Sequence, residues 1–114
     1  MRADGFATLM VFVDRPLAAA RCWGELLGAA PSNDDPQLVD AEQVQLFLHM
    51  ADPQRNPQGG TVAYLAVTDF DQSRAELLEA GCVAHRGPLT LDDGRRICQI
   101  RDPFGTVWGL EETR

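Results

Sequence analysis

Cysteine is scarce in this chain of 114 residues, and its spacing excludes two kinds of small scaffold. Cys22, Cys82 and Cys98 are odd in number, lie far apart and include no Cys-x-x-Cys pair. A disulfide framework needs paired cysteines, and a structural zinc site needs clustered ones. We therefore expect three reduced cysteines that pack as small apolar side chains.

Positive charge is also in short supply. The 10 basic residues are outnumbered by 17 aspartates and glutamates, which gives a net charge of −7. Such a surface repels phosphate backbones and anionic membranes, so neither nucleic acid nor a membrane is an expected partner. The same surface attracts cationic small molecules.

Long apolar runs and catalytic signatures are missing as well. No run approaches the ~18 apolar residues that a membrane helix needs. The first residues, Met1-Arg2-Ala3-Asp4, lack the apolar core of a signal peptide, so a cytoplasmic location is expected. Ser32 and Ser73 fall in a predicted loop and at a predicted helix start, which disfavours a Ser-His-Asp triad, and no catalytic residue is predicted.

The first half of the chain shows a strand, a helix and further strands. Phe6 to Val13 is an apolar, β-prone run. Asp14 and Pro16 suit a helix start, and Gly28 suits the end of that helix. The later elements predicted here are a loop or proline-interrupted edge strand (29–37), strands 38–41 and 44–50 joined by a turn at Glu42-Gln43, and a linker (51–60).

The second half repeats this order. Strand 61–68 precedes a helix that Asp69 or Asp71 caps and that stops at Gly81. Strand 82–91 leads to Asp93-Gly94, which favours a type I′ hairpin turn. Strands 96–101 and 106–111 complete the copy, and Asp102-Pro103-Phe104-Gly105 forms the turn between them.

The chain is thus one α+β domain, residues 1–114, in which strand–helix–strand–strand–strand is written twice. The first module is expected at 5–50, the linker at 51–60 and the second module at 61–112. One helix covers only one face of each sheet, so the other face needs a cover of its own.

Three motifs carry a resemblance to a known family. They are Val13-Asp14-Arg15-Pro16, Val67-Thr68-Asp69-Phe70-Asp71 and Asp102-Pro103-Phe104-Gly105, each before a helix or a strand. In this order they resemble the glyoxalase, bleomycin-resistance and dioxygenase (vicinal-oxygen-chelate) superfamily over residues 5–112. The resemblance implies two βαβββ modules with mixed sheets that form open half-barrels, and usually a homodimer.

The resemblance also implies four metal-ligand positions, which here hold Thr8, Gln45, Val62 and Gly109. Divalent metals in such sites need imidazole or carboxylate groups, and none of these residues has one. We therefore expect neither a metal site nor a cofactor. A displaced site using His49 and Glu111, which share the parity of these positions, stays open as an alternative.

The strand positions that point inward in the family give a candidate ligand-binding lining. Gly109 has no side chain, so we expect open space there. Trp23 and Trp108 are expected to pack against a helix or a sheet. The candidate ligand-binding residues are Thr8, Met10, Phe12, Gln45, Phe47, His49, Val62, Tyr64, Gln99, Gly109 and Glu111.

This mostly apolar lining with a few polar groups is typical of an organic-ligand pocket. The leading interpretation is a metal-free binding protein that resembles bleomycin-resistance proteins and sequesters a cationic or aromatic small molecule in an inter-module cavity. One alternative is a glyoxalase-like lyase or isomerase, or a dioxygenase-related enzyme, with a displaced metal site. Another is a scaffold without enzymatic activity whose cavity is vestigial.

Overall fold

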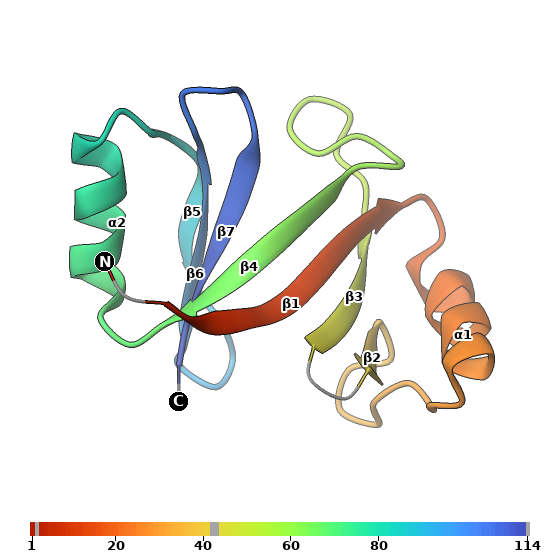
Figure 1. Ribbon diagram of the computed structural model, residues 1–114. Coiled ribbons are helices and arrows are strands. Elements are labelled where there is room, and N and C mark those ends of the chain that lie inside the picture. Colours follow the sequence, from red (N-terminus) through yellow and green to blue (C-terminus); the bar gives the residue numbers. More distant parts are fainter. Residues whose placement is uncertain (2, 42–43, 114) are drawn as a thin grey trace. The chain divides into compact units, whose positions relative to one another are not determined.

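A computed structural model describes residues 1, 3–41 and 44–113 (Figure 1). The turn expected at Glu42-Gln43 lies outside the described residues. Neither helix in this part of the chain is long and apolar enough to cross a bilayer. The elements are β1 (Ala3–Val13), α1 (Pro16–Leu27), β2 (Leu38–Ala41), β3 (Val44–Met50), β4 (Thr61–Val67), α2 (Phe70–Glu79), β5 (Val83–Thr90), β6 (Arg96–Arg101) and β7 (Val107–Glu112).

The chain divides into two compact units. The N-terminal unit is Thr8–Val62, and the C-terminal unit combines Met1–Ala7 with Ala63–Arg114. Strands run in the order β2-β3-β1 in the first and β4-β7-β6-β5 in the second, as parts of one seven-stranded sheet. The β1–β3 and β4–β7 pairs are parallel and the β2–β3, β5–β6 and β6–β7 pairs antiparallel, which confirms the predicted α+β class with mixed pairing.

In the N-terminal unit, α1 packs on one face of its three strands. Ala20, Val39 and Leu48 are wholly buried at this contact. Pro16 begins the helix, and Gly28 ends it in the left-handed conformation, with φ of 69°, as predicted. The predicted cap at Asp14 is wrong, because Arg15 is the N-cap residue and no side chain accepts a hydrogen bond there.

Residues 29–37, expected to be a loop or a proline-interrupted edge strand, form a loop with one isolated bridge, between Pro31 and Val39. Proline lacks the N–H that a strand ladder needs, so the run 29–37 with its two prolines does not extend the pairing. The first copy of the repeat therefore has three strands in its described residues, whereas the second has four.

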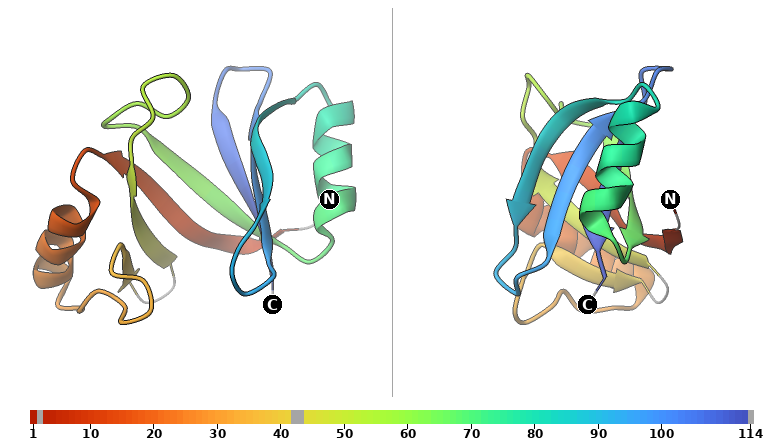
Figure 2. Two further views of the ribbon diagram at one scale, coloured as in Figure 1. Left: turned by 180° about the vertical axis from the view of Figure 1, so that it is seen from behind. Right: turned by 90° about the vertical axis from the view of Figure 1, so that its left-hand side faces the viewer.

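In the C-terminal unit, α2 lies against one face of the sheet (Figure 2, right). The core under the helix contains Val67, Phe70, Cys98 and Leu110. Asp69 caps the helix, since its carboxylate accepts a hydrogen bond from the N–H of Gln72 at 3.1 Å. The prediction left Asp69 and Asp71 open, and the structure selects the first.

The turn after β5 differs from the predicted type I′ geometry. The N–H of Gly94 donates to the carbonyl of Leu91 at 2.9 Å, so Asp92 and Asp93 are the central residues and Gly94 follows them with φ of 88°. This is the three-residue hairpin loop in which a glycine forms a bulge. The sequence signal places a turn here, but the register of β5 on β6 decides which residues are central.

The two tryptophans and one of the three cysteines depart from the expected packing. Trp108 shares a sheet face with Leu110, as expected, but its ring stacks on Phe6 at 6.5 Å between centroids. Trp23 is 46% exposed, so it is not a core residue. Cys82 and Cys98 are buried, whereas Cys22 is exposed on α1.

The Asp102 carboxylate organises the last turn. Its Oδ1 accepts hydrogen bonds from the N–H groups of Phe104 and Thr106, both at 2.9 Å, and its Oδ2 accepts one from Trp108 Nε1 at 3.0 Å. The backbone N–H of Thr106 contributes most to lowering the pKa of Asp102, and the indole of Trp108 adds to it. The carboxylate thus joins the turn to the strand that follows.

We expect Asp102→Ala to lower the melting temperature at neutral pH. The folded pKa of Asp102 lies below the unfolded value of about 3.9, so its stabilisation is complete above that value and is lost as pH falls through the folded pKa. Thermal unfolding followed by circular dichroism should show the difference from wild type shrinking in acid. Asp92→Ala, in the other turn, is the control; an equal loss there would contradict this role.

Candidate functional site

Three strands of the C-terminal unit set one row of side chains on the sheet face opposite α2. Tyr64 on β4 lies beside Gly109 on β7, and Gly109 lies beside Gln99 on β6. Residues that pair across neighbouring strands point to the same face. Ala66, Glu111 and Ile97 form the next row on that face. The alternation assumed from the sequence therefore holds in this unit.

Gly109 marks a close approach, not open space. A Cβ atom built at this position would lie 2.5 Å from Cε2 and from Cγ of Tyr64, well inside van der Waals contact. The phenol ring therefore covers the glycine backbone. The expectation that Gly109 leaves room for a ligand is wrong, because the tyrosine from the neighbouring strand fills that room.

The ring of Tyr64 reaches across β7 to β6. Gln99 Nε2 donates a hydrogen bond to the Tyr64 hydroxyl at 2.8 Å, and both side chains are buried, at 1% and 2% exposed. Burial raises the pKa of Tyr64, while the Gln99 hydrogen bond and the positive charge of Arg86 act in the opposite direction. Tyr64 is therefore a neutral phenol at physiological pH.

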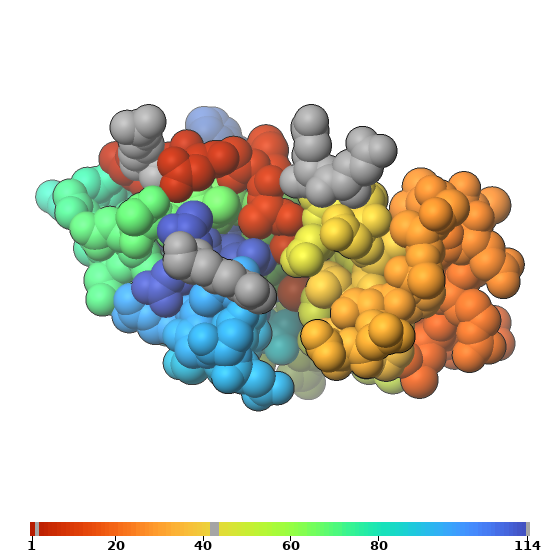
Figure 3. Space-filling model, turned by 90° about the horizontal axis from the view of Figure 1, so that it is seen from below, coloured from red at the N-terminus to blue at the C-terminus, as the bar shows by residue number. Residues whose placement is uncertain are grey.

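Glu111, in the next row, is held by an arginine from the hairpin after β5. Arg95 Nη1 donates to Glu111 Oε2 at 2.8 Å, and Arg95 Nε donates to Asp93 Oδ2 at 2.8 Å. The hairpin is light blue in Figure 3 and lies at the surface of its unit. Glu111 is thus a paired carboxylate, which leaves it poorly suited to be a general base.

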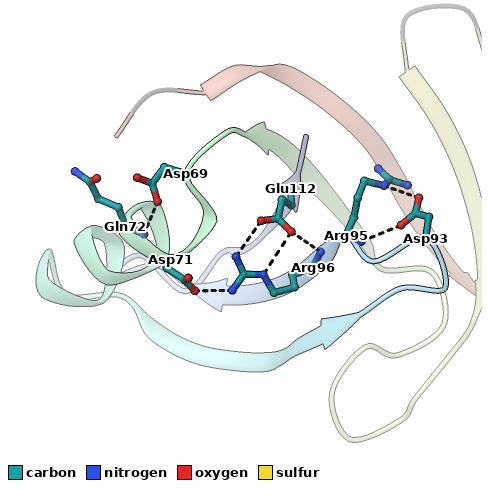
Figure 4. Close-up of polar contacts among 7 residues, drawn as sticks. All are labelled: Asp69, Asp71, Gln72, Asp93, Arg95, Arg96 and Glu112. Carbon is teal, nitrogen blue, oxygen red and sulfur yellow. Dashed lines mark hydrogen bonds and ion pairs between the residues drawn. The ribbon is translucent and has the colours of Figure 1, made fainter. Parts of the chain in front are cut away.

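A second group of ion pairs lies on the helix side of the same sheet (Figure 4). Arg96 bridges Asp71 on α2 and Glu112 on β7, at 2.8 and 2.9 Å, and its guanidinium lies 4.8 Å from the centroid of the Phe70 ring. These contacts fix α2 on the sheet. Because they lie on the face that α2 covers, we assign them to the packing of the helix and not to a binding site.

In the N-terminal unit, register places the predicted residues of β1 and β3 on one face. Thr8 pairs with Gln45, Met10 with Phe47 and Phe12 with His49. The face of Val39 and Leu48 is covered by α1, so these six residues occupy the opposite face. Phe12 is 1% exposed and Met10 5%, which makes them core side chains of the folded chain.

His49 is engaged within its own strand. Its Nδ1 lies 2.9 Å from the Met50 carbonyl oxygen, and its ring packs at 5.5 Å from Phe47 and 5.8 Å from Phe12. Nδ1–H donation to a carbonyl leaves Nε2 as the acceptor. With Glu111 paired to Arg95, the displaced His49–Glu111 site gains no support from either residue's surroundings.

The four positions implied by the family do not fit a divalent metal. Val62 is apolar and 2% exposed, and Gly109 offers no donor and is covered by Tyr64. Thr8 and Gln45 carry a hydroxyl and a neutral amide, which are weak ligands for such ions. Over residues 1, 3–41 and 44–113, no group of three histidine, cysteine, aspartate or glutamate side chains is placed to hold an ion.

A separate hollow of about 360 Å³ lies on the helix side of the N-terminal unit. Trp23 and Leu27 of α1 form one wall, and Leu9 and Val11 of β1 form the floor with Ala41, Val44, Gln45 and Leu46. The hollow explains why Trp23 is half-exposed. Of the predicted lining residues only Gln45 is among the residues that line it. The helical spacing of Trp23 and Leu27 gave no signal that separated this hollow from core packing.

The sequence matches the model of the glyoxalase/bleomycin resistance protein/dioxygenase superfamily over residues 5–110. This span covers nearly the whole chain, so the protein belongs to that superfamily. No curated protein matches the chain.

Solved structures share the fold. A hypothetical protein from Methanosarcina mazei is 22% identical, with a TM-score of 0.62 over 100% of this chain and 95% of that chain. Methylmalonyl-CoA epimerase from Mycobacterium tuberculosis is 22% identical, with a TM-score of 0.63 over 98% and 89%. The Streptomyces coelicolor methylmalonyl-CoA epimerase is 14% identical, with a TM-score of 0.73 over 98% and 99%. At these identities the likeness establishes the fold alone.

Two arginines of the C-terminal unit were missed by sequence reasoning. Arg86 pairs with Gln99 across β5 and β6, and Arg95 holds Glu111. The signal for Arg95 was its place directly after the Asp93-Gly94 turn. The face on which Arg86 lies could not be read from the sequence. Register shifts on both sides of Arg86 interrupt the regular alternation of β5 side chains between the two sheet faces.

We expect Gly109→Ala to destabilise the protein because the added methyl collides with Tyr64. Overpacking of this kind costs about 1–3 kcal/mol. In a Tyr64→Ala background the same methyl has space, so its cost should largely vanish. Denaturant unfolding of the two single variants and the double variant measures this coupling, and equal costs in both backgrounds would refute the close approach.

Tyr64 is the chain's one tyrosine, so its ionisation can be read directly from tyrosinate absorbance. Because burial raises its pKa, the phenolate should form above the ordinary value of about 10. The folded state then holds its proton more tightly than the unfolded state. Stability should therefore fall as pH rises from the unfolded to the folded pKa. Ionisation at or below the ordinary value would contradict the buried placement.

Proposed function

We propose that this protein binds a small organic molecule without a divalent metal, as a binding protein similar to bleomycin-resistance proteins. The observation that carries the proposal is the Tyr64 ring over Gly109. It fills the space at a position where metal-dependent relatives supply a ligand. With Val62 and Thr8 at two further positions, the chain keeps the superfamily's scaffold and lacks the donor set for its metal chemistry.

Binding does not require that chemistry. Affinity alone lowers the free concentration of a molecule, so sequestration needs an apolar surface and a few polar groups but no catalytic base. Phe47, Ile97 and Ala66 supply partly buried apolar surface on the faces opposite the helices. The cytoplasmic location and the homodimer implied by the resemblance are part of this proposal.

An enzymatic role is the alternative, and the epimerase neighbours are the observation in its favour. Under this alternative the protein acts on a thioester or a related carbonyl compound, as the names of those neighbours describe for them. Such a reaction needs a group that accepts a proton. The neutral phenol of Tyr64 and the paired carboxylate of Glu111 are poor candidates, which is why binding is proposed first.

Elemental analysis and thermal shift together test the proposal. Protein equilibrated with Mn²⁺, Ni²⁺ or Zn²⁺ and then desalted should retain no stoichiometric ion, and a chelator should leave its melting temperature unchanged. Aromatic carboxylates, amines and neutral amides should then be screened, since a ligand of the native state raises the melting temperature. Stoichiometric metal would overturn the metal-free proposal, and a screen without any shift would favour the vestigial scaffold.

A further inference from the structure

Arg86 is a half-buried cation on the open face of the C-terminal unit. It pairs with Gln99 across the β5–β6 ladder, so it belongs to the face that carries Tyr64 and Gly109. Its positive charge opposes the rise in the pKa of Tyr64, which agrees with a place on the same face. The register of β5 on β6 therefore sets the face on which Arg86 lies.

Two other arginines of this unit, Arg95 and Arg96, are held by carboxylates, whereas no carboxylate among the described residues holds Arg86. Arg95 pairs with Asp93 and Glu111, and Arg96 pairs with Asp71 and Glu112. Among the described residues, neither a hydrogen bond nor an ion pair engages the Arg86 guanidinium. The chain has 17 carboxylates for 10 basic residues, so a shortage of acidic groups does not explain this.

A partly desolvated guanidinium is stabilised by an oxyanion, which it binds through two parallel N–H···O bonds. Glu111, which lies on the same face, is paired with Arg95.

The residues around Arg86 favour a ligand whose remaining part, beside the anionic group, is apolar. Val83 and Leu89 flank it on β5; they pair with Arg101 and Ile97 and so face the same side. They are 56% and 42% exposed, so they present apolar surface to the solvent. Because β5 is the last strand in its unit's order, this surface is reached from the sheet edge.

From this arrangement we infer that Arg86 is the anion-recognition group of the protein, and that its ligand is a small organic carboxylate whose apolar part lies on Val83, Leu89 and Ile97. The inference rests on the proposed binding function and names the class of its ligand. This ligand is an anion, whereas the net charge favours a cation. Direct contact with Arg86 should outweigh the attraction of the net charge, because salt screens that attraction within about 8–10 Å.

A matched probe series tests the inference by nuclear magnetic resonance. Benzoate, phenyl phosphate, benzylamine and benzamide share one ring and differ in charge and headgroup. Benzoate should shift the Arg86 Nε–H resonance and the backbone amides of Val83 and Leu89. Its affinity should fall about ten- to hundredfold in Arg86→Gln, as expected for loss of a charge-assisted pair. Phenyl phosphate binding more tightly than benzoate would assign the site to phosphates and overturn the carboxylate.

Controls separate this inference from the proposed function. Arg21→Gln removes an exposed arginine of α1 in the other unit and should leave benzoate binding unchanged. Tyrosinate titration of Arg86→Gln should show the pKa of Tyr64 rising, since the opposing charge is gone; an unchanged pKa would remove Arg86 from the site. Benzamide or benzylamine binding as well as benzoate would overturn the inference and leave the binding function standing. Absence of any benzoate shift also overturns it.

Discussion

The hydrogen bond from Gln99 to the Tyr64 hydroxyl depends on Gly109, which neither donates nor accepts in it. The ring that carries the hydroxyl crosses β7 at Gly109, and any side chain there would collide with it. Glycine, a buried phenol and a buried amide therefore form one unit across three strands. A buried hydroxyl or amide without a partner costs free energy, so each of the two polar groups stabilises the other's burial.

This row decides what the face can do. Tyr64 and Gln99 are joined by a hydrogen bond, and both side chains are buried, at 2% and 1% exposed. Glu111 is similarly held by Arg95. These side chains are buried and bonded to one another or to Arg95, so the recognition that we propose lies at the edge strand β5. There the register places Arg86 between the exposed apolar side chains of Val83 and Leu89.

Features that depend only on residues nearby in the sequence, such as helix ends, could be predicted from the sequence. Gly28 ends α1 and Asp69 caps α2 because only nearby residues matter to a helix end. The turn at Gly94 was located but mistyped, since strand register selects its central residues. The alternation of β4, β6 and β7 was also predictable, because a regular strand keeps its period of two. Gly109 was different. A mid-strand glycine signals either open space or a close approach, and the choice depends on Tyr64, which is distant in sequence and adjacent in space.

The net charge of the chain favours a cationic ligand, whereas the guanidinium of Arg86 favours an anionic one. The two effects act over different distances. A net charge of −7 acts over the whole surface but is screened by salt beyond about a Debye length. It influences which molecules approach. Once a ligand touches the sheet, its energy depends on the few groups within hydrogen-bond reach, where water no longer screens. At the β5 edge the guanidinium of Arg86 has no carboxylate partner among the described residues, so under our proposal an acidic protein can select an anion there. The excess acidic residues elsewhere then repel anions that lack a part fitting Val83 and Leu89, which adds discrimination.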